Sequence, residues 1–110
     1  MLTQLFNEHE SFEVIGEASS GPEAVDLSVK KQADLILIDY SLPGFDGAEA
    51  LRLIGLNNPH QKAIGFTSFD MPEIIESFKD NGATQVILKG SDPELLIKLC
   101  LKVLGDTTMA

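Results

Sequence analysis

Asp39, Thr67 and Lys89 are each the last residue of a short apolar run that reads as a β-strand. A carboxylate can act as a nucleophile toward a phosphoryl group, an ammonium can neutralise the charge of the product, and a hydroxyl can donate a hydrogen bond to a phosphoryl oxygen. The three together are a minimal set for making and sensing an aspartyl phosphate. Sites in open parallel sheets form beyond the carboxyl ends of the strands, so we expect these residues to meet at one edge.

Each of these residues also has an ordinary structural explanation. Asp39 suits a turn in which it binds nearby backbone, Thr67 suits a strand because it is β-branched, and Lys89 suits a solvated strand end. Taken singly, each structural explanation is as good as the functional one. Two charged residues that directly follow apolar strands must, however, lie at the same rim of the sheet, and this favours a shared function.

The elements that position these residues alternate between strands and helices. Leu35 to Ile38 shows no polar alternation, as a parallel strand covered by helices on both faces requires. Asp46 and Asp70 are predicted helix N-caps, and Gly82 is a predicted left-handed helix stop. This order predicts an α/β fold with a parallel sheet and right-handed crossovers. We expect strands at 12–18, 35–39, 63–67 and 85–89 and helices, caps included, at 2–9, 21–31, 46–56, 70–82 and 92–105.

Composition limits the classes of function. The chain has 110 residues, 44% of them hydrophobic, which predicts a single domain over residues 1–110. Its 17 acidic and 8 basic residues give a net charge of −9, so we expect this domain alone to bind neither nucleic acid nor an anionic membrane. No signal peptide and no apolar run of roughly 20 residues is present, so we expect a cytoplasmic protein. The apolar surroundings of Cys100 favour a core residue over a reactive thiol.

At these residues the sequence resembles the receiver domains of response regulators, the CheY-like phospho-accepting switches of two-component signalling. Leu35 to Gly47 resembles their phosphorylation site, where the acceptor aspartate ends a strand and a Pro-Gly-x-Asp-Gly turn leads into a helix. Gly65 to Ser68 resembles the strand with the switch hydroxyl, and Gly82 to Lys89 the strand with the lysine. Phe12 to Ala18 is similar to receivers that precede helix-turn-helix output domains. The resemblance extends from residue 2 to about residue 104.

The resemblance implies a flavodoxin-like (CheY-like) fold and a role for each matching residue. Asp39 would be the phosphoacceptor, Thr67 the hydroxyl that reorients toward the phosphoryl group, and Lys89 its charge partner. The family also holds Mg²⁺ with the acceptor, a backbone carbonyl that corresponds here to Ser41, and an acidic pair after its first strand. The implied partner is a sensor histidine kinase or a phosphotransfer protein, and no enzymatic activity is expected.

The chain departs from the family pattern near its amino-terminal end. By alignment, Met1 falls inside the family's first helix, so the first strand and the acidic pair have no counterpart. We therefore expect a sheet without the family's first strand and Mg²⁺ binding that is weak or absent. The strand at 12–18 would pair directly with the strand at 35–39, or another chain would fill the gap, and we favour a homodimer or larger assembly.

Two functions stay open on the sequence alone. One is a receiver phosphorylated on Asp39, and the other is a receiver-derived protein-interaction module that is not efficiently phosphorylated. A phosphatase with two aspartates at a strand end is disfavoured because Ser41 stands where the second carboxylate is needed. Nucleotide binding is disfavoured because no glycine-rich turn follows a strand. Gly90 in place of the family's proline predicts a trans bond after Lys89.

Overall fold

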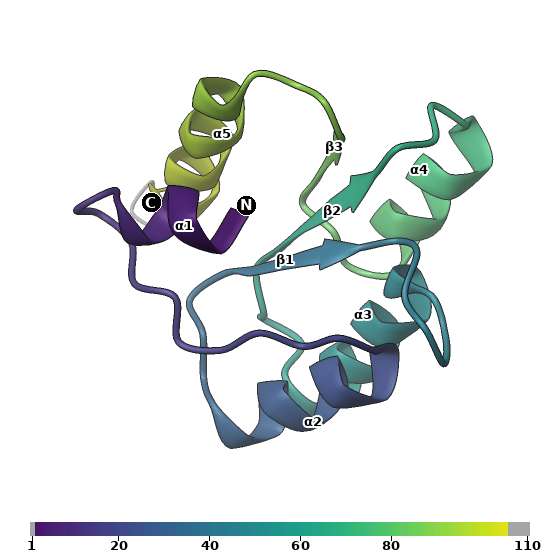
Figure 1. Ribbon diagram of the computed structural model, residues 1–110. Coiled ribbons are helices and arrows are strands. Elements are labelled where there is room, and N and C mark those ends of the chain that lie inside the picture. The colour runs from purple at the N-terminus through teal and green to yellow at the C-terminus, as the bar shows by residue number, and fades with distance from the viewer. Residues whose placement is uncertain (1, 106–110) are drawn as a thin grey trace.

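The computed structural model describes residues 2–105, so the alignment made at Met1 lies outside the described residues. Helices cover both faces of a central sheet, with α1 and α5 on one face and α2, α3 and α4 on the other (Figure 1). This architecture confirms the predicted α/β fold class. In chain order the elements are α1 (Leu2–Asn7), α2 (Gly21–Lys30), β1 (Ile36–Asp39), α3 (Gly47–Asn57), β2 (Ala63–Thr67), α4 (Pro72–Asp80), β3 (Gln85–Leu88) and α5 (Pro93–Gly105).

The sheet has 3 parallel strands in the order β1-β2-β3. Successive residues of a strand point to opposite faces, and β1 shows this directly. Ile36 and Ile38 pack in the cluster formed with α2, α3 and α4, whereas Leu35 and Leu37 pack in the cluster formed with α1 and α5. Because helices cover both faces of β1, its sequence is an unbroken apolar run. Burying each aliphatic side chain of this size contributes roughly 1.5–3 kcal/mol to the stability of the fold.

The strand expected at residues 12–18 does not form, and the predicted direct pairing with 35–39 is wrong. Figure 1 shows this segment as an irregular stretch between α1 and α2 that runs in the same direction as β1. Its polar groups bond to side chains: Val14 N–H donates to Asn7 Oδ1 at 3.4 Å, and Ile15 C=O accepts from Lys31 Nζ at 2.7 Å.

The physical reason is the position of the segment's apolar side chains. Phe12 and Val14 pack into the cluster of α1 and α5, and the ring of Phe12 meets that of Phe6 edge-on with centroids 4.9 Å apart. A β-ladder needs a neighbouring strand about 4.8 Å away, and a groove of about 870 Å³ separates this segment from β1 instead. Residues 12–18 have the composition of a strand, but β1 lies too far away to pair with them.

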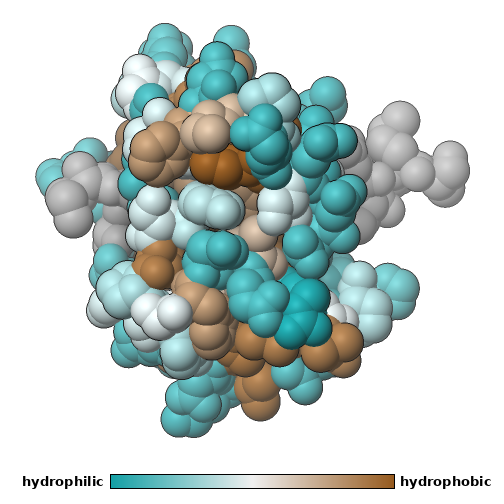
Figure 2. All heavy atoms as spheres, turned by 90° about the vertical axis from the view of Figure 1, so that its right-hand side faces the viewer, coloured by the Kyte–Doolittle hydropathy of each residue, from teal (hydrophilic) through white to brown (hydrophobic). Residues whose placement is uncertain are grey.

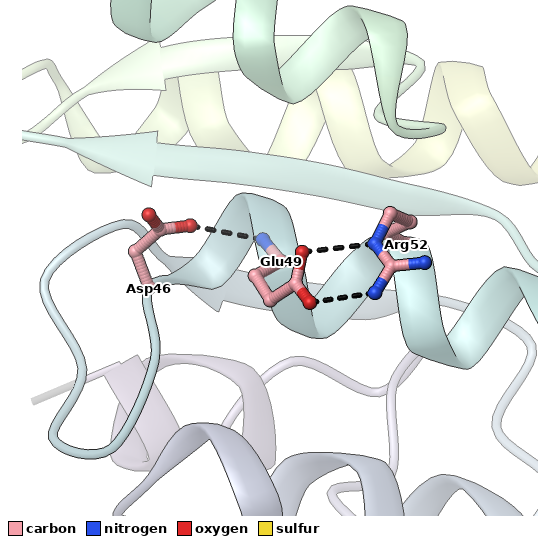
Figure 3. A network of polar contacts seen from close by, with 3 residues as sticks. All are labelled: Asp46, Glu49 and Arg52. Carbon is pink, nitrogen blue, oxygen red and sulfur yellow. Dashed lines mark hydrogen bonds and ion pairs between the residues drawn. The ribbon is translucent and has the colours of Figure 1, made fainter.

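The helix ends follow the sequence signals with one exception. Asp46 caps α3 as predicted, since its Oδ1 accepts the Glu49 N–H at 2.9 Å (Figure 3). Gly82 has a φ of 112°, which confirms the left-handed stop after α4. Asp70 was the wrong residue for the cap of α4, because Met71 holds that position and makes no side-chain cap bond. Pro72 begins the helix there, where a missing N–H removes no helical bond.

Two smaller predictions are confirmed. Cys100 is fully buried in the cluster of α1 and α5, with 0% of its surface exposed. The described residues contain no cis peptide bond, so the bond between Lys89 and Gly90 is trans. No helix between residues 2 and 105 is long and apolar enough to cross a membrane.

Candidate functional site

The carboxyl edge of the sheet brings Asp39, Thr67 and Lys89 to neighbouring positions. Asp39 ends β1, Thr67 ends β2, and Lys89 directly follows β3. The Lys89 N–H donates to the Thr67 carbonyl at 2.8 Å, which continues the ladder past the end of β3. Figure 2 looks onto the side of the molecule toward which β1 and β2 point, where hydrophilic residues lie across the middle of the face.

Asp39 and Lys89 form an ion pair at this edge. The Lys89 ammonium donates to Asp39 Oδ2, and the second carboxylate oxygen, Oδ1, accepts the Ser41 N–H at 3.0 Å. Both carboxylate oxygens therefore have a donor, which holds the group in one orientation. The side chains are 30% exposed for Asp39 and 37% for Lys89, so water and a reactant can still reach them. The ammonium also lies 5.9 Å from the centroid of the Phe66 ring.

The Thr67 hydroxyl is placed differently from the ion pair. Thr67 is only 1% exposed, and its Oγ1 accepts the Phe69 N–H at 3.0 Å. This bond closes a local turn just after β2 and occupies the hydroxyl oxygen as an acceptor. The three residues share the carboxyl edge of the sheet, as the sequence predicts, but they do not all line the same groove. The groove next to β1 is lined by Asp39 and Lys89, whereas Thr67 is not among its lining residues.

The turn between Asp39 and α3 is built around a close backbone approach. Gly47 N–H donates to the Tyr40 carbonyl at 2.9 Å, and a Cβ on Gly47 would lie 2.1 Å from the Asp39 carbonyl oxygen. Only glycine fits there, so the Gly47 of the predicted turn is a steric requirement of the site. The turn then leads into α3, where Glu49 and Arg52 form an exposed ion pair (Figure 3).

Tyr40 is a neighbour of the site that the sequence did not reveal. Its pKa lies above the ordinary tyrosine value, first because of burial, then because the nearby Asp46 carboxylate disfavours a second negative charge and accepts a hydrogen bond from the hydroxyl. Its ring also meets that of Phe78 edge-on, with centroids 5.7 Å apart. Asp46 therefore serves both the cap of α3 and the Tyr40 hydroxyl. No periodicity or spacing would have indicated the second role.

Among the described residues, the site offers Mg²⁺ a single side-chain carboxylate. Mg²⁺ prefers octahedral oxygen ligands that include one or two carboxylates. Asp39 supplies one carboxylate, and Lys89 already neutralises it. The Ser41 N–H donates to the same carboxylate, whereas the ligand that the resemblance implies at this residue is its backbone carbonyl. Within residues 2–105, no three His, Cys, Asp or Glu side chains gather closely enough to hold a metal ion.

Comparison with known proteins gives consistent similarities. Residues 1–100 match the family described as the response regulator receiver domain. The chain is 33% identical over 93 residues to the uncharacterized transcriptional regulatory protein YhcZ of Bacillus subtilis, covering 84% of this chain and 44% of YhcZ. It is 33% identical over 86 residues to the nitrate/nitrite response regulator protein NarP of Escherichia coli, covering 78% of this chain and 40% of NarP. The chain thus spans less than half the length of these relatives.

The solved structures agree with the fold. A LuxR-family two-component response regulator from Aurantimonas sp. SI85-9A1 superposes with a TM-score of 0.90. That match covers 96% of this chain and 75% of the other, at 26% sequence identity. These relatives accord with the resemblance seen at residues 12–18 to receivers that precede a helix-turn-helix output domain.

Proposed function

The chain belongs to the response regulator receiver domain family of two-component signal transduction, and on that premise we propose that Asp39 is the residue that accepts the phosphoryl group. The single observation that carries this proposal is the ion pair between Asp39 and Lys89 at the carboxyl edge of the sheet. The pair presents a carboxylate beside an ammonium group, at a position where the two side chains are still partly exposed.

The proposed transfer uses these groups as follows. An Asp39 carboxylate oxygen attacks the phosphorus of a phosphohistidine, a P–O bond forms, and the P–N bond breaks. The electron pair of the broken bond stays on the imidazole nitrogen of the donor. The product carries more negative charge than the free carboxylate, and the Lys89 ammonium stabilises that charge because it already contacts Asp39.

Thr67 has a further part in the proposal. We propose that the hydroxyl reorients toward the phosphoryl group and thereby gives up the bond that Oγ1 now accepts from the Phe69 N–H. The cost is one buried hydrogen bond, worth about 0.5–1.5 kcal/mol, and a bond to a charged phosphoryl oxygen offsets it. Phosphorylation would thus be read as a change in the turn at residues 67–69.

Metal use is where this chain is proposed to differ from its family. Receiver domains as a family use Mg²⁺ in phosphorylation. For this chain we propose weak Mg²⁺ binding, because Asp39 is a single, already paired carboxylate. Residues 39 and 41 would be the ligands if an ion binds, through the carboxylate and the backbone carbonyl. The ion would supply charge neutralisation at the phosphoryl oxygens.

Partners follow from the same premise. Receiver domains interact with histidine kinases or phosphotransfer proteins, and we propose one of these as the phosphoryl donor. The chain itself would serve as a substrate of that donor and not as an enzyme. Homodimer formation and the absence of nucleic-acid binding by this domain stay predictions.

A second candidate function rests on the same donor set. Lys89 engages the carboxylate of Asp39, and the described residues provide no second acidic ligand, so a receiver-derived interaction module without efficient phosphorylation is also consistent with this site. The two functions differ in one measurable property. A module of this kind would bind its partner equally well with Asp39 replaced.

The experiment is a phosphotransfer assay read by intact-protein mass spectrometry. The chain is incubated with acetyl phosphate and Mg²⁺ or with a phosphorylated phosphotransfer protein, and peptide mapping locates any phosphoryl group. We expect a single hydroxylamine-sensitive phosphoryl group on Asp39, lost in Asp39→Asn and kept in the control Asp34→Asn, an exposed aspartate at the other end of the strand. No incorporation with either donor would reject the receiver proposal in favour of the interaction module.

A further inference from the structure

The Lys89 side chain reaches Asp39 across an intervening strand. The sheet order is β1-β2-β3, so β2 lies between the strand that ends at Asp39 and the strand that leads into Lys89 (Figure 1). Neighbouring strands lie about 4.8 Å apart, which puts the backbones of β1 and β3 roughly 10 Å apart. The lysine side chain must cross that gap for its ammonium to donate to Asp39 Oδ2.

The backbone from which the Lys89 side chain starts is fixed. Its N–H donates to the Thr67 carbonyl at 2.8 Å, and the next residue, Gly90, turns the chain away with a φ of 89°. The Ser91 hydroxyl then donates to the Leu88 carbonyl at 2.7 Å and closes this turn. The position of the ammonium therefore depends on the side-chain torsions of Lys89.

The ion pair by itself restricts those torsions only weakly. The Lys89 and Asp39 side chains are 37% and 30% exposed, and ion pairs in such surroundings gain little over hydration by water. A lysine side chain also loses much rotamer freedom when it is fixed in one conformation. A further contact to the ammonium would therefore keep it beside the carboxylate for a larger fraction of the time.

Phe66 is the residue of β2 that lies between Asp39 and Lys89. It is the register partner of Asp39 on one side and of Ile87 on the other. Leu37, Phe66 and Ile87 all pack in the cluster of α1 and α5. Side chains two residues apart on a strand share a face, so Asp39, Phe66 and Lys89 lie on the same face of the sheet.

The ring of Phe66 is anchored in the core and lies under the lysine ammonium. The side chain is half-buried and packs against the cluster of α1 and α5. The Lys89 Nζ lies over this ring, 5.9 Å from its centroid. The face of an aromatic ring carries partial negative charge and attracts an ammonium at this range, whereas an aliphatic side chain offers no such attraction.

From these contacts we propose that Phe66 is a positioning residue for phosphoryl transfer to Asp39, because the face of its ring holds the Lys89 ammonium beside the carboxylate. The ring acts through Lys89 and not on the reacting atoms. It increases the fraction of molecules in which the ammonium already stands where negative charge develops during the transfer. This inference rests on the proposed role of Asp39 as the phosphoacceptor.

The first test is a double-mutant cycle on the whole chain, with acetyl phosphate and Mg²⁺ as reactants and intact-protein mass spectrometry as the readout. Phe66→Leu keeps an apolar side chain and removes the ring. We expect it to slow phosphorylation about two- to fivefold, the range that corresponds to a cation–π contact at a partly exposed site. In a chain that already carries Lys89→Ala, the same substitution should have no effect, because the ammonium is gone.

Phe12→Leu is the matched control for this cycle. Phe12 is another half-buried phenylalanine that packs against the cluster of α1 and α5, but its ring meets that of Phe6 and not the lysine ammonium. We expect this substitution to leave the phosphorylation rate unchanged. The comparison separates the loss of a ring from the core from the loss of the ring beside Lys89.

A second test keeps the shape of the ring. Phenylalanine with one, two or three fluorine atoms, introduced at residue 66, progressively weakens the negative charge on the ring face while it adds little volume. We expect the phosphorylation rate constant to fall with each added fluorine. Urea denaturation should give nearly the same free energy of unfolding for all of these chains, so a lower rate would not reflect a damaged fold.

A third measurement does not depend on phosphorylation. Protons that lie over an aromatic ring resonate upfield, so NMR should show the ε-methylene protons of Lys89 upfield of those of the exposed Lys102. Phe66→Leu should abolish this difference. If the unaltered chain accepts no phosphoryl group, the proposed function fails and the role in transfer fails with it, whereas the NMR shift still shows whether the ring holds the ammonium.

Three results would overturn the proposal. Equal slowing by Phe66→Leu with and without the Lys89 ammonium would show that Phe66 acts only through the fold. A rate constant that does not respond to fluorination would show that the charge on the ring face has no part in positioning. Lys89 methylene protons that do not move in Phe66→Leu would place the ammonium away from the ring.

Discussion

The α-carbon of Gly47 packs against the backbone carbonyl of Asp39, so that a Cβ on residue 47 would lie 2.1 Å from the carbonyl oxygen. This contact fixes the first turn of α3 to the end of β1. The proposed phosphoacceptor is thus positioned by its backbone as well as by the side-chain contacts with Lys89 and Ser41.

The first prediction follows from that contact. Alanine is normally favoured over glycine in a helix by about 1 kcal/mol, and Gly55 of the same helix has open space around it, so Gly55→Ala should stabilise the chain by about that amount. Gly47→Ala should instead destabilise it by roughly 1–3 kcal/mol, because backbone must move. Urea denaturation measures both. A stabilised Gly47→Ala variant would show that the contact is not rigid.

The second prediction concerns Lys89. If its ammonium stabilises the charge of the aspartyl phosphate, Lys89→Ala should slow phosphorylation by roughly a hundredfold, as loss of a charge-stabilising donor does in other sites. The pair is partly exposed, so the free energy of unfolding should change by only about 0–1 kcal/mol. Lys102→Ala on α5 is the control. Equal rates for the two variants, measured with acetyl phosphate, would remove Lys89 from the mechanism.

The third prediction concerns the Thr67 hydroxyl. Thr67→Val removes the acceptor of the Phe69 N–H and should cost about 1–3 kcal/mol, whereas Thr67→Ser keeps the oxygen and should cost less. Phosphorylation of the unaltered chain should shift the Phe69 amide resonance and speed its hydrogen exchange, because the hydroxyl turns toward the phosphoryl group. A Phe69 amide that stays protected after phosphorylation would argue against this movement.

The fourth prediction is a pH dependence that arises from Cys100. Burial raises the pKa of its thiol to about 11 in the folded chain, whereas an unfolded thiol titrates near ~8.5. The unfolded state therefore loses its proton first as the pH rises. The stability contribution is complete below about pH 8.5 and is lost as the pH approaches about 11, by at most about 3 kcal/mol.

Comparison of the unaltered chain with Cys100→Ala isolates this effect, since the two proteins have every other titratable group in common. The difference in unfolding free energy between the unaltered chain and Cys100→Ala should shrink between pH 8 and pH 10.5. This range covers the lower part of the pH interval over which the stability contribution of the thiol is lost. A difference that stays constant with pH would show that the buried thiol does not titrate abnormally.

The fifth prediction concerns Mg²⁺. Asp39 offers one carboxylate, which is already paired with Lys89. Calorimetry should therefore give a much larger Mg²⁺ dissociation constant for this chain than for a receiver with an acidic pair measured alongside. Lys89→Ala frees the carboxylate and should strengthen the binding. A dissociation constant equal to that of the reference receiver would contradict the donor-set argument.

The sequence by itself determined the order of elements and the edge where the site lies. Leu35 to Ile38 reads as a buried parallel strand because both faces of β1 are covered, and the Asp46 cap and the Gly82 stop act within a turn of their own helices. Signals of this kind depend only on residues near one another in the chain, so they can be recognised in a single sequence. Parallel strands then place their last residues together, which brought Asp39 and Lys89 to one edge.

Only the tertiary structure decided which of those groups touch. Lys89 reaches Asp39, whereas the Thr67 hydroxyl turns to the Phe69 N–H, and spacing along the chain cannot distinguish the two. The segment at residues 12–18 has strand-like composition yet stays unpaired, because a ladder depends on the distance to a neighbour that the segment does not encode. Backbone pairing is a property of two segments, and the packing of the whole domain sets how far apart they lie.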